Sequence, residues 1–429
     1  MRHRLGGYGL AIAFFLSACS PSARLHKQID RAETEFHDHI GFMLYDPEKR
    51  KTLYEHQGDR YFIPASNTKI FTLYTSLRLL GDSIPALRYE QRGDSLIFWG
   101  TGDPSFLYDD VMPATRTYAF LSGAPKLYYS PSNFDGEHFG PGWAWGDYRY
   151  SYQVERTPLP IYGNRFHMRK SGAQFSPSPR IFATEVQRAP QPRERNDLVR
   201  GLDSNNLLYI PGTKDSTFHW EIPFHYSHDL LTRLLSDTLK KEVSLAQVPL
   251  TSRARTLYSV PADSLYKVMM QESDNFIAEQ LLLVCAGVLS DTLRTDIAIR
   301  EAKRQFLADL PDEPIWVDGS GLSRMNLFTP RSIVRLWEKT SEIVPRERLF
   351  SLLAVGGVSG TIRNNYKGER PFVFGKTGSL RNNHMLSGFI VTRKGRTLVF
   401  SWMNNNFAVS TGSVRGRMEE ILKFIYETY

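Results

Sequence analysis

The chain has 429 residues, which is long enough for two or three domains and a large hydrophobic core. Hydrophobic residues make up 41% and charged residues 23%, which is the balance of an ordinary globular protein rather than of a disordered one. The formal net charge is +8, but no run of basic residues is dense enough to indicate a nucleic-acid-binding protein.

The first residues differ in character from the rest of the chain. The segment "MRHRLGGYGLAIAFFLSAC" begins with basic residues and continues with an apolar run from Leu10 to Leu16. This run is too short to span a bilayer but fits the core of an export signal. The next residues, Leu16-Ser17-Ala18-Cys19, resemble a bacterial lipobox, which implies a signal peptide over 1–18, cleavage before Cys19 and a lipid on its sulfur. The alternative is a plain signal peptide that is cut near the same place.

An export signal also bears on charge, location and the cysteines. Loss of Arg2 and Arg4 with the signal would lower the net charge from +8 to +6, and a mildly basic exported protein suits an anionic cell envelope. We therefore expect a lipid-anchored protein in the periplasm. Ser20 is not the aspartate associated with inner-membrane retention in enteric bacteria, so the outer membrane is favoured. The second cysteine, Cys285, lies in an apolar run and is expected to be a small buried side chain rather than half of a disulfide.

In chain order, the first half of the sequence predicts a helix, a hairpin, a second helix and then a long irregular region. The helix is expected over 22–36, and "HIGFMLYDPEKRKTLYEHQ" reads as two short strands around a polar turn. A further helix runs from Ser66 to Leu80. From about Arg88 to about Pro249 the chain is rich in Gly, Pro, Ser and aromatic residues, which predicts a β-rich and loop-rich region with one helix over 227–240.

The second half predicts helices, then an antiparallel sheet and a final helix. Three strands are expected in "RPFVFGKTGSL", "HMLSGFIVT" and "TLVFSWMNN", followed by an amphipathic helix over 414–429. The early hairpin could join this sheet. The expected fold is therefore α+β: an antiparallel sheet flanked by helices, with a catalytic domain in two parts, 22–87 and 256–429, around a β-rich insertion at 88–255.

Three short motifs point to chemistry, although none is specific by itself. S-x-x-K occurs twice, at 66–69 and 264–267, and about two matches are expected by chance in a chain of this length. S-x-N also occurs twice, at 204–206 and 273–275, whereas K-T-G occurs once, at 376–378. The structural alternatives are helix capping for the serines and asparagine, and a glycine kink beside a solvated lysine for K-T-G.

The context of Ser66 favours a chemical role. Ser66 and Lys69 open an apolar helix after Pro64, and a spacing of three residues places both side chains on one face. Unpaired backbone N–H groups and the helix dipole at such a position suit an oxyanion. A lysine among apolar neighbours can lose its proton near neutral pH and act as a base.

The order of the motifs gives them their specificity. S-x-x-K on a helix, S-D-N at a later helix start and K-T-G on a late strand form the three-part signature of penicillin-recognising serine acyltransferases. The chain closely resembles this superfamily from about residue 38 to its C-terminus, and within it the class C low-molecular-mass penicillin-binding proteins, the D-alanyl-D-alanine carboxypeptidase/endopeptidase type represented by penicillin-binding protein 4. The segments that carry the resemblance are "GTGDPSF" (100–106), "GPGWAWGDYRY" (140–150), "SDNFIAEQLLL" (273–283), "DGSGLSRMN" (318–326), "GTIRNNYKG" (360–368) and "GKTGSLRNNHMLSGFIV" (375–391).

The resemblance implies a β-lactamase/transpeptidase-like fold and assigns a role to each motif residue. Ser66 is the implied nucleophile and Lys69 its base. Ser273 is implied to relay a proton to the leaving amine, and Asn275 to orient Lys69 and the substrate amide. Lys376 is implied to help keep Lys69 neutral, because two nearby cations resist being charged together.

Further residues are implied to bind the substrate. The backbone N–H groups of Ser66 and Ser379 would form the oxyanion hole. The terminal carboxylate would be bound by Lys376, Thr377, Gly378 and Ser379. Asp147, in "WAWGD", matches an aspartate that binds the free amino end of the stem-peptide side chain in this family; the alternative is an aspartate in an exposed loop.

The sequence gives little support for other kinds of functional site. No P-loop, dinucleotide fingerprint, G-x-S-x-G elbow or H-E-x-x-H motif occurs, so we expect neither a cofactor nor a metal. The best metal-like cluster, His225-x-x-His228-Asp229, is interpreted as the capped start of the helix at Ser227. The expected partners are peptidoglycan stem peptides, β-lactams as inhibitors and the membrane through Cys19, with no nucleic acid.

Two alternative functions stay open at this point. A serine β-lactamase would share the three motifs, but class A β-lactamases have the first two far closer together than the 204 positions (273 − 69) that separate Lys69 from Ser273. Those enzymes also need a glutamate-bearing loop that we cannot place in this sequence. A non-catalytic cell-wall-binding lipoprotein would need a broken motif, and all three are intact.

Overall fold

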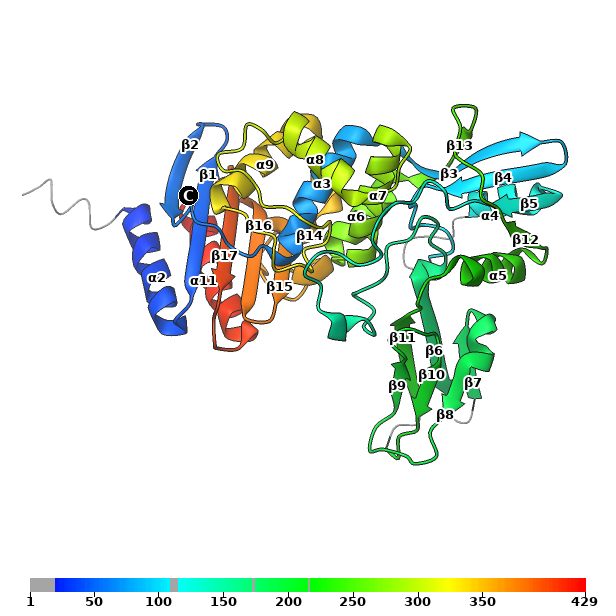
Figure 1. The fold of residues 1–429 in the computed structure, drawn as a ribbon. Coiled ribbons are helices and arrows are strands. Elements are labelled where there is room, and N and C mark those ends of the chain that lie inside the picture. Colours follow the sequence, from blue (N-terminus) through cyan, green and yellow to red (C-terminus); the bar gives the residue numbers. More distant parts are fainter. Residues whose placement is uncertain (1–19, 109–114, 172–173, 215–216) are drawn as a thin grey trace, which may run out of the picture. The chain divides into compact units, whose positions relative to one another are not determined.

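The computed structural model describes residues 20–108, 115–171, 174–214 and 217–429 (Figure 1). The predicted signal peptide at 1–18 and the predicted lipidation site at Cys19 lie outside the described residues. The chain divides into two compact units: the first comprises Met1–Asn67, Leu310–Ile315 and Leu327–Tyr429, and the second comprises Thr68–Asp309 and Trp316–Asn326. The domain boundaries expected at 22–87, 88–255 and 256–429 stay a prediction.

One antiparallel sheet of six strands organises the first unit, in the order β14-β15-β16-β17-β1-β2 (Figure 1). The early hairpin joins the C-terminal strands as expected, because β1 pairs with β17, with His39 opposite Asn405. The strands are β1 (His39–Asp46), β2 (Lys51–His56), β14 (Ala354–Val355), β15 (Val373–Leu380), β16 (Asn383–Val391) and β17 (Thr397–Asn405).

Helices cover both faces of this sheet. Leu386 and Ile390 of β16 pack in one buried cluster with α2 and α11, whereas Ser387 of the same strand faces Trp337 of α9, because successive side chains of a strand point to opposite faces. Helix α2 packs against the sheet because its buried side chains recur at helical spacing and form one apolar stripe. The helices are α2 (Pro21–Phe36), α9 (Pro330–Ile343), α10 (Arg346–Leu352) and α11 (Thr411–Thr428), with short 3-10 turns η1 (Ala65–Thr68) and η5 (Gly360–Ile362).

The second unit contains a group of helices around α7. Residues 276–286 of α7 are all buried, and most of them are apolar. Cys285 lies in this run; its side chain is fully buried, and burial raises the pKa of its thiol to about 12. The helices are α3 (Lys69–Leu79), α4 (Thr115–Gly123), α5 (His228–Leu239), α6 (Ala262–Gln271), α7 (Asn275–Ser290) and α8 (Thr295–Gln305).

The rest of the second unit is rich in strands, as its composition predicts. Its sheets have the orders β12-β5-β4-β3-β13, β8-β10-β9 and β11-β6-β7. Their strands are β3 (Ser83–Arg92), β4 (Ser95–Gly100), β5 (Lys126–Tyr129), β6 (Arg165–Ser171), β7 (Gln174–Ser178), β8 (Val186–Arg188), β9 (Asp197–Arg200), β10 (Leu207–Ile210), β11 (Thr217–Pro223), β12 (Val243–Leu245) and β13 (Arg255–Pro261), with 3-10 turns η2 (Trp145–Asp147), η3 (Tyr162–Asn164) and η4 (Arg180–Glu185).

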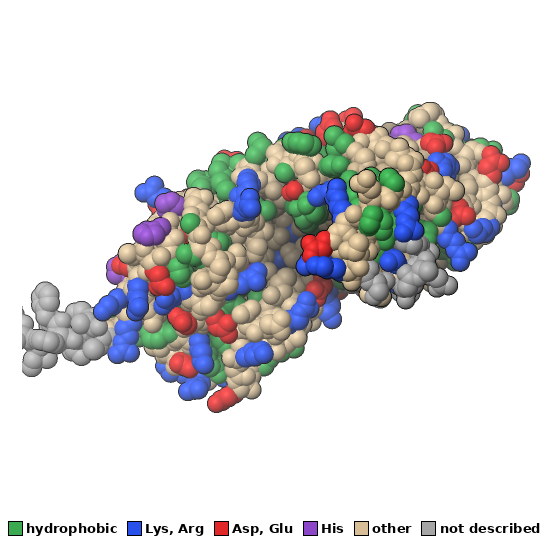
Figure 2. Space-filling view, turned by 90° about the horizontal axis from the view of Figure 1, so that it is seen from below, with side chains coloured by type: hydrophobic (Ala, Val, Ile, Leu, Met, Phe, Trp, Pro, Cys, Tyr) green, Lys and Arg blue, Asp and Glu red, His purple; other side chains and the backbone are tan. Residues whose placement is uncertain are grey.

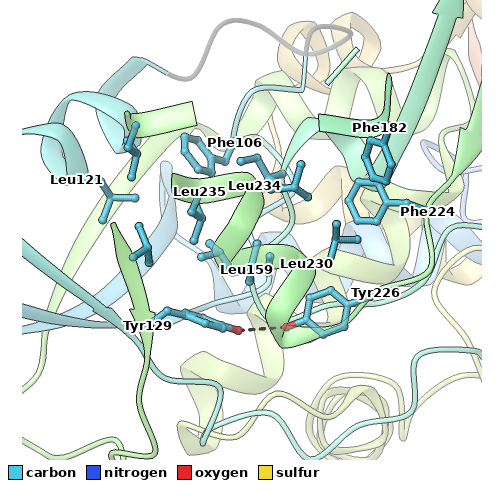
Figure 3. Close-up of a cluster of buried hydrophobic side chains, with 14 of the residues drawn as sticks. Phe106, Leu121, Tyr129, Leu159, Phe182, Phe224, Tyr226, Leu230, Leu234 and Leu235 are labelled. Carbon is cyan, nitrogen blue, oxygen red and sulfur yellow. Dashed lines mark hydrogen bonds between the residues drawn. The ribbon is translucent and has the colours of Figure 1, made fainter. Parts of the chain in front are cut away.

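A hydrophobic core of its own supports this part of the second unit (Figure 3). Leucines of α5 pack there against aromatic side chains from the surrounding strands and loops, and the hydroxyls of Tyr129 and Tyr226 lie 3.3 Å apart. Ser227 caps α5 by accepting a hydrogen bond from the backbone N–H of Leu230, which agrees with the interpretation of this segment as a helix start.

The face of the molecule seen in Figure 2 carries side chains of both charges. Figure 2 shows Lys and Arg side chains interspersed with Asp and Glu side chains, as a modest net charge leads one to expect. None of the helices in the described part of the chain has the length and apolar character that a membrane crossing requires.

Candidate active site

In the first unit, the turn that carries Ser66 lies directly against the strand that carries K-T-G. A Cβ built on Gly378 would lie 2.7 Å from the carbonyl oxygen of Pro64 and 3.0 Å from the backbone nitrogen of Ser66. No side chain fits in that space, which gives a physical reason for glycine at this position. The sequence predicts an α-helix from Ser66, but the structure begins with the 3-10 turn η1, and Ala65 just before it has a left-handed φ of 44°.

Asn67 connects the same turn to strand β15. Its amide Nδ2 donates a hydrogen bond to the backbone oxygen of Lys376 at 2.9 Å, and its Oδ1 accepts one from Ser387 Oγ at 2.7 Å. The indole N–H of Trp337 in turn donates to Ser387 Oγ at 3.0 Å. All four residues are fully buried, so these polar groups depend on one another rather than on water.

The side chains of the K-T-G strand alternate between the two faces of the sheet. Lys376 is fully buried, and its Nζ donates to the backbone oxygen of Thr377 at 2.7 Å. The Thr377 hydroxyl donates to the hydroxyl of Thr361 at 2.7 Å. Ser379 is exposed, and its hydroxyl lies 2.7 Å from Nδ1 of His384, its cross-strand partner.

The sequence reasoning missed His384. Burial, together with the positive charge of Arg415, lowers the pKa of His384 to about 3, so this imidazole is neutral at physiological pH. The signal for it was the hairpin register, in which His384 follows Ser379 by five residues across the turn between β15 and β16.

In the second unit, Lys69 is held at the start of α3. Its ammonium group is fully buried and donates to Oδ1 of Asn275 at 2.6 Å and to the backbone oxygen of Ser320 at 2.7 Å. The structure thus brings together two of the predicted residues that are 206 positions apart in the sequence. Ser66 and Lys69 are joined by two residues only, and the division between the units falls between those two.

Burial controls the protonation of Lys69. Removal from water lowers its pKa from 10.5 to about 8, and the nearby negative charges of Asp318, Asp274 and Glu279 oppose this shift. Roughly a tenth of the amine is therefore neutral at pH 7, and the fraction rises steeply above that pH. A lysine in this state can accept a proton from a hydroxyl.

The S-D-N segment combines a structural and a chemical part. Asp274 caps α7 by accepting from the backbone N–H of Ile277 at 2.8 Å, and it also accepts from the hydroxyl of Tyr108 at 2.5 Å. Ser273 has a left-handed φ of 64°, an uncommon conformation for a serine. The capping interpretation therefore holds for Asp274, while Asn275 contacts Lys69.

A loop at 318–326 supplies the carbonyl that faces Lys69. Asp318 accepts from the indole N–H of Trp143 at 2.9 Å and from the backbone N–H groups of Gly321 and Ser323 at 2.8 and 2.7 Å. Glu279, which is 1% exposed, accepts from the backbone N–H of Ser320 at 2.7 Å.

Arg156 pairs with the other oxygen of Glu279 at 2.9 and 2.6 Å. The segment "DGSGLS" contributes to the family resemblance, but neither the contact of the Ser320 carbonyl nor that of Glu279 can be read from residue types.

Asp147 lies in a turn rich in aromatic residues. Partial removal from water raises the pKa of the Tyr152 hydroxyl to about 12, and the charge of Asp147 and a hydrogen bond to it add to the shift. The rings of Tyr150 and Tyr152 stack at 5.4 Å, and Trp145 is 78% exposed. Asn275 Nδ2 donates to the backbone oxygen of Tyr152 at 2.9 Å, so this aromatic turn contacts the residue that also contacts Lys69.

Within the described parts of the chain, two groups of side chains could hold a metal ion: His26, Asp30 and His56 in the first unit, and His167, His219 and Glu221 in the second. In both groups a histidine already lies beside a carboxylate: His26 Nε2 is 3.2 Å from Asp30 Oδ2, and His167 Nδ1 is 3.7 Å from Glu221 Oε1. The side chains of the metal-like sequence cluster His225-x-x-His228-Asp229 have separate partners, because His225 contacts Glu155 and His228 contacts Tyr226.

Comparison with known proteins gives a consistent picture. D-alanyl-D-alanine carboxypeptidase DacB of Haemophilus influenzae is 24% identical over 437 residues, covering 88% of this chain and 87% of that protein. D-alanyl-D-alanine carboxypeptidase of Actinomadura sp. is also 24% identical, over 85% of this chain and 77% of its own.

Among solved structures, penicillin-binding protein 4 of H. influenzae has the same fold, with a TM-score of 0.77 and 19% identity over 94% of this chain and 99% of that one. A predatory endopeptidase of Bdellovibrio bacteriovorus in complex with an immunity protein is more distant, with a TM-score of 0.51 and 16% identity over 90% of this chain and 91% of that one.

The family model of the D-Ala-D-Ala carboxypeptidase 3 (S13) peptidases matches residues 23–426, which is nearly the whole chain. The matched range includes the turn of Ser66, the S-D-N helix start and the K-T-G strand. With the motifs in order, the relatives and the shared fold, this match leads to one conclusion: the chain belongs to the D-Ala-D-Ala carboxypeptidase 3 (S13) family.

Proposed function

We propose that this protein is a serine-type D-Ala-D-Ala carboxypeptidase/endopeptidase that trims or un-crosslinks peptidoglycan stem peptides through an acyl-enzyme on Ser66. The observation that carries the proposal is Lys69. It follows Ser66 by three residues, is fully buried between Asn275 and the Ser320 carbonyl, and has its pKa lowered to about 8. A buried lysine of this kind is suited to serve as the base of a serine nucleophile.

Acylation would proceed in two proton-balanced steps. The Ser66 hydroxyl oxygen attacks the carbonyl carbon between the two D-alanines while the neutral amine of Lys69 takes the hydroxyl proton. The backbone N–H groups of Ser66 and Ser379 stabilise the resulting oxyanion. The C–N bond then breaks as Ser273 relays the proton from the Lys69 ammonium to the leaving amine, so that D-alanine departs and Lys69 is neutral again. Water attacks the ester in the same way, which releases the shortened peptide and restores Ser66.

The remaining predicted residues would orient the substrate. Asn275 holds both Lys69 and the substrate amide, and the positive charge of Lys376 favours the neutral form of Lys69. Lys376, Thr377, Gly378 and Ser379 bind the terminal carboxylate. Asp147, at the edge of the aromatic turn, binds the free amino end of the stem-peptide side chain by charge.

A β-lactam would acylate the same serine. A solved structure of H. influenzae penicillin-binding protein 4 is described as complexed with a β-lactam, and one of a B. bacteriovorus endopeptidase as acylated by penicillin G. By analogy, penicillin should leave a long-lived ester on Ser66 of this protein.

The same proposal includes location. The lipobox-like segment that ends at Cys19 supports a protein that is exported, cleaved and held in the periplasm by lipid on Cys19, with the outer membrane favoured.

Labelling with fluorescent penicillin tests the proposed chemistry. The chain from residue 20 onwards should carry a stable label, and Ser66→Ala should carry none. The wild-type protein should also release D-alanine from a pentapeptide ending in D-Ala-D-Ala.

The other outcomes are equally informative. Label on both proteins would remove Ser66 from its role. Rapid loss of label with consumption of penicillin would favour a β-lactamase, and no label on the wild type would favour a wall-binding protein without activity.

A further inference from the structure

The hydrogen-bond relay Trp337–Ser387–Asn67, which ends on the backbone of Lys376, lies outside the three motifs' chemistry. We propose that Asn67 is a positioning residue: it fixes the spacing between the Ser66 turn and strand β15, and with it the spacing of the two backbone N–H groups of the proposed oxyanion hole. The inference rests on the proposed function and adds a residue to which that function assigns no role.

The polarity of the relay fixes the orientation of the Asn67 amide from both ends. The indole nitrogen of Trp337 can only donate, so Ser387 Oγ accepts there at 3.0 Å and keeps its single proton for Asn67 Oδ1 at 2.7 Å. At the other end, the backbone oxygen of Lys376 can only accept, so it faces the Nδ2 side of the amide at 2.9 Å. Both ends of the relay thus require the same orientation of the Asn67 amide, and the flipped amide would satisfy neither contact.

The relay acts where the turn and the strand are closest. Gly378 leaves no room for a side chain beside the Ser66 nitrogen, so the two segments are in contact from one side, and Asn67 ties them together two residues upstream on β15. Asn67 and Ser387 are fully buried and cannot exchange these partners for water. Small displacements of an oxyanion-hole donor cost much rate, because such donors act only at short range.

Ser401 provides a matched control. It is the cross-strand partner of Ser387 on β17 and equally buried, but its hydroxyl has no hydrogen-bond partner among the described residues. Ser401→Ala therefore removes one buried hydroxyl from the same region, as Ser387→Ala does, but leaves the relay intact.

The test compares Asn67→Asp, Ser387→Ala and Ser401→Ala in the chain from residue 20 onwards. Asp places an oxygen against the Lys376 carbonyl, so Asn67→Asp should lower the acylation rate constant for fluorescent penicillin by about 10²-fold, and Ser387→Ala by about 10-fold. The dissociation constant of the non-covalent complex should stay within about three-fold, and Ser401→Ala should acylate within about two-fold of wild type.

A second measurement does not depend on activity. Amide hydrogen exchange of residues 65–69 should be faster in Asn67→Asp and Ser387→Ala than in wild type and unchanged in Ser401→Ala. Folded Asn67→Asp with wild-type acylation, or equal losses in Ser387→Ala and Ser401→Ala, would overturn the inference. If the wild-type protein takes no label, the proposed function fails. The exchange measurement still tests the positioning role in that case, and unchanged exchange in Asn67→Asp and Ser387→Ala would overturn it.

Discussion

At the residue scale, the protonation of Lys69 is the most informative property of the site. Burial pushes its pKa down, while the carboxylates of Asp318, Asp274 and Glu279 push it back up, and the balance lies at about 8. Both effects set this value: with burial alone the pKa of Lys69 would be lower still, and in water the lysine would stay charged near neutral pH.

This balance predicts a pH dependence. The base must be neutral to work, so the acylation rate should rise with pH through a midpoint near 8. Asp274→Asn keeps the oxygen that caps α7 but removes one negative charge, and so should move the midpoint to lower pH by roughly half a unit. The rate constant for penicillin acylation, measured from pH 5.5 to 9.5, gives both midpoints.

The exposed Asp229, in the first turn of α5, supplies the control for this experiment. Asp229→Asn removes the same charge elsewhere and should leave the midpoint in place. A midpoint in Asp274→Asn that is equal to or higher than that of wild type would contradict the electrostatic account.

The neutral state of His384 leads to a companion expectation. Because its pKa lies at about 3, no histidine titration should appear in the pH dependence of substrate affinity between pH 5 and 8, although His384 contacts Ser379.

At the element scale, the first unit depends on how closely η1 approaches β15. The two segments pack backbone against backbone at Gly378, and the hydrogen bond from Asn67 to Lys376 closes the same contact. A strand with a side chain at this position could not come as close, so glycine here is a requirement of packing as well as part of a motif.

Gly378→Ala should therefore damage the site without unfolding the protein. The new methyl group would meet backbone atoms of Pro64 and Ser66, which cannot rotate away as a side chain could. We expect penicillin acylation to fall by about 10²-fold, because the Ser66 N–H proposed as an oxyanion-hole donor would be displaced. Gly81→Ala is the control, since a Cβ at Gly81 meets nothing within 4 Å; wild-type acylation by Gly378→Ala would show that the contact is not required.

At the scale of the whole molecule, the residues assigned to the chemistry are divided between two units. Ser66 and the K-T-G strand belong to the first, and Lys69, Ser273, Asn275 and Asp147 belong to the second. Two residues of the chain separate the proposed nucleophile from its proposed base, and the division between the units falls between Asn67 and Thr68.

Attachment to a membrane is also a property of the whole chain. If Cys19 bears lipid, the full-length protein expressed in a bacterium should partition into the detergent phase of Triton X-114, and mass spectrometry should find an acylated N-terminal residue 19. Cys19→Ala should move the protein to the aqueous phase, whereas Cys285→Ala should not. Recovery of the wild type in the aqueous phase without lipid would favour the plain signal peptide.

Much of this protein could be predicted from its sequence because the signals are local. The hairpin at 39–56, the strands around K-T-G and the cap at Ser227 follow from alternation, turn residues and capping preferences acting over a few positions. The order of the three motifs was enough to indicate the family, since it depends on residue types alone.

Tertiary structure alone decided the environment of each group. That Lys69 meets Asn275 and the carbonyl of Ser320, and that Glu279 accepts a hydrogen bond from the backbone N–H of Ser320, depends on contacts between distant segments. Burial and charge at a point in space set the pKa of Lys69, and no local pattern records either quantity. For the same reason Asn67 reads as an ordinary helix residue until Ser387 and Trp337 are seen on its other side.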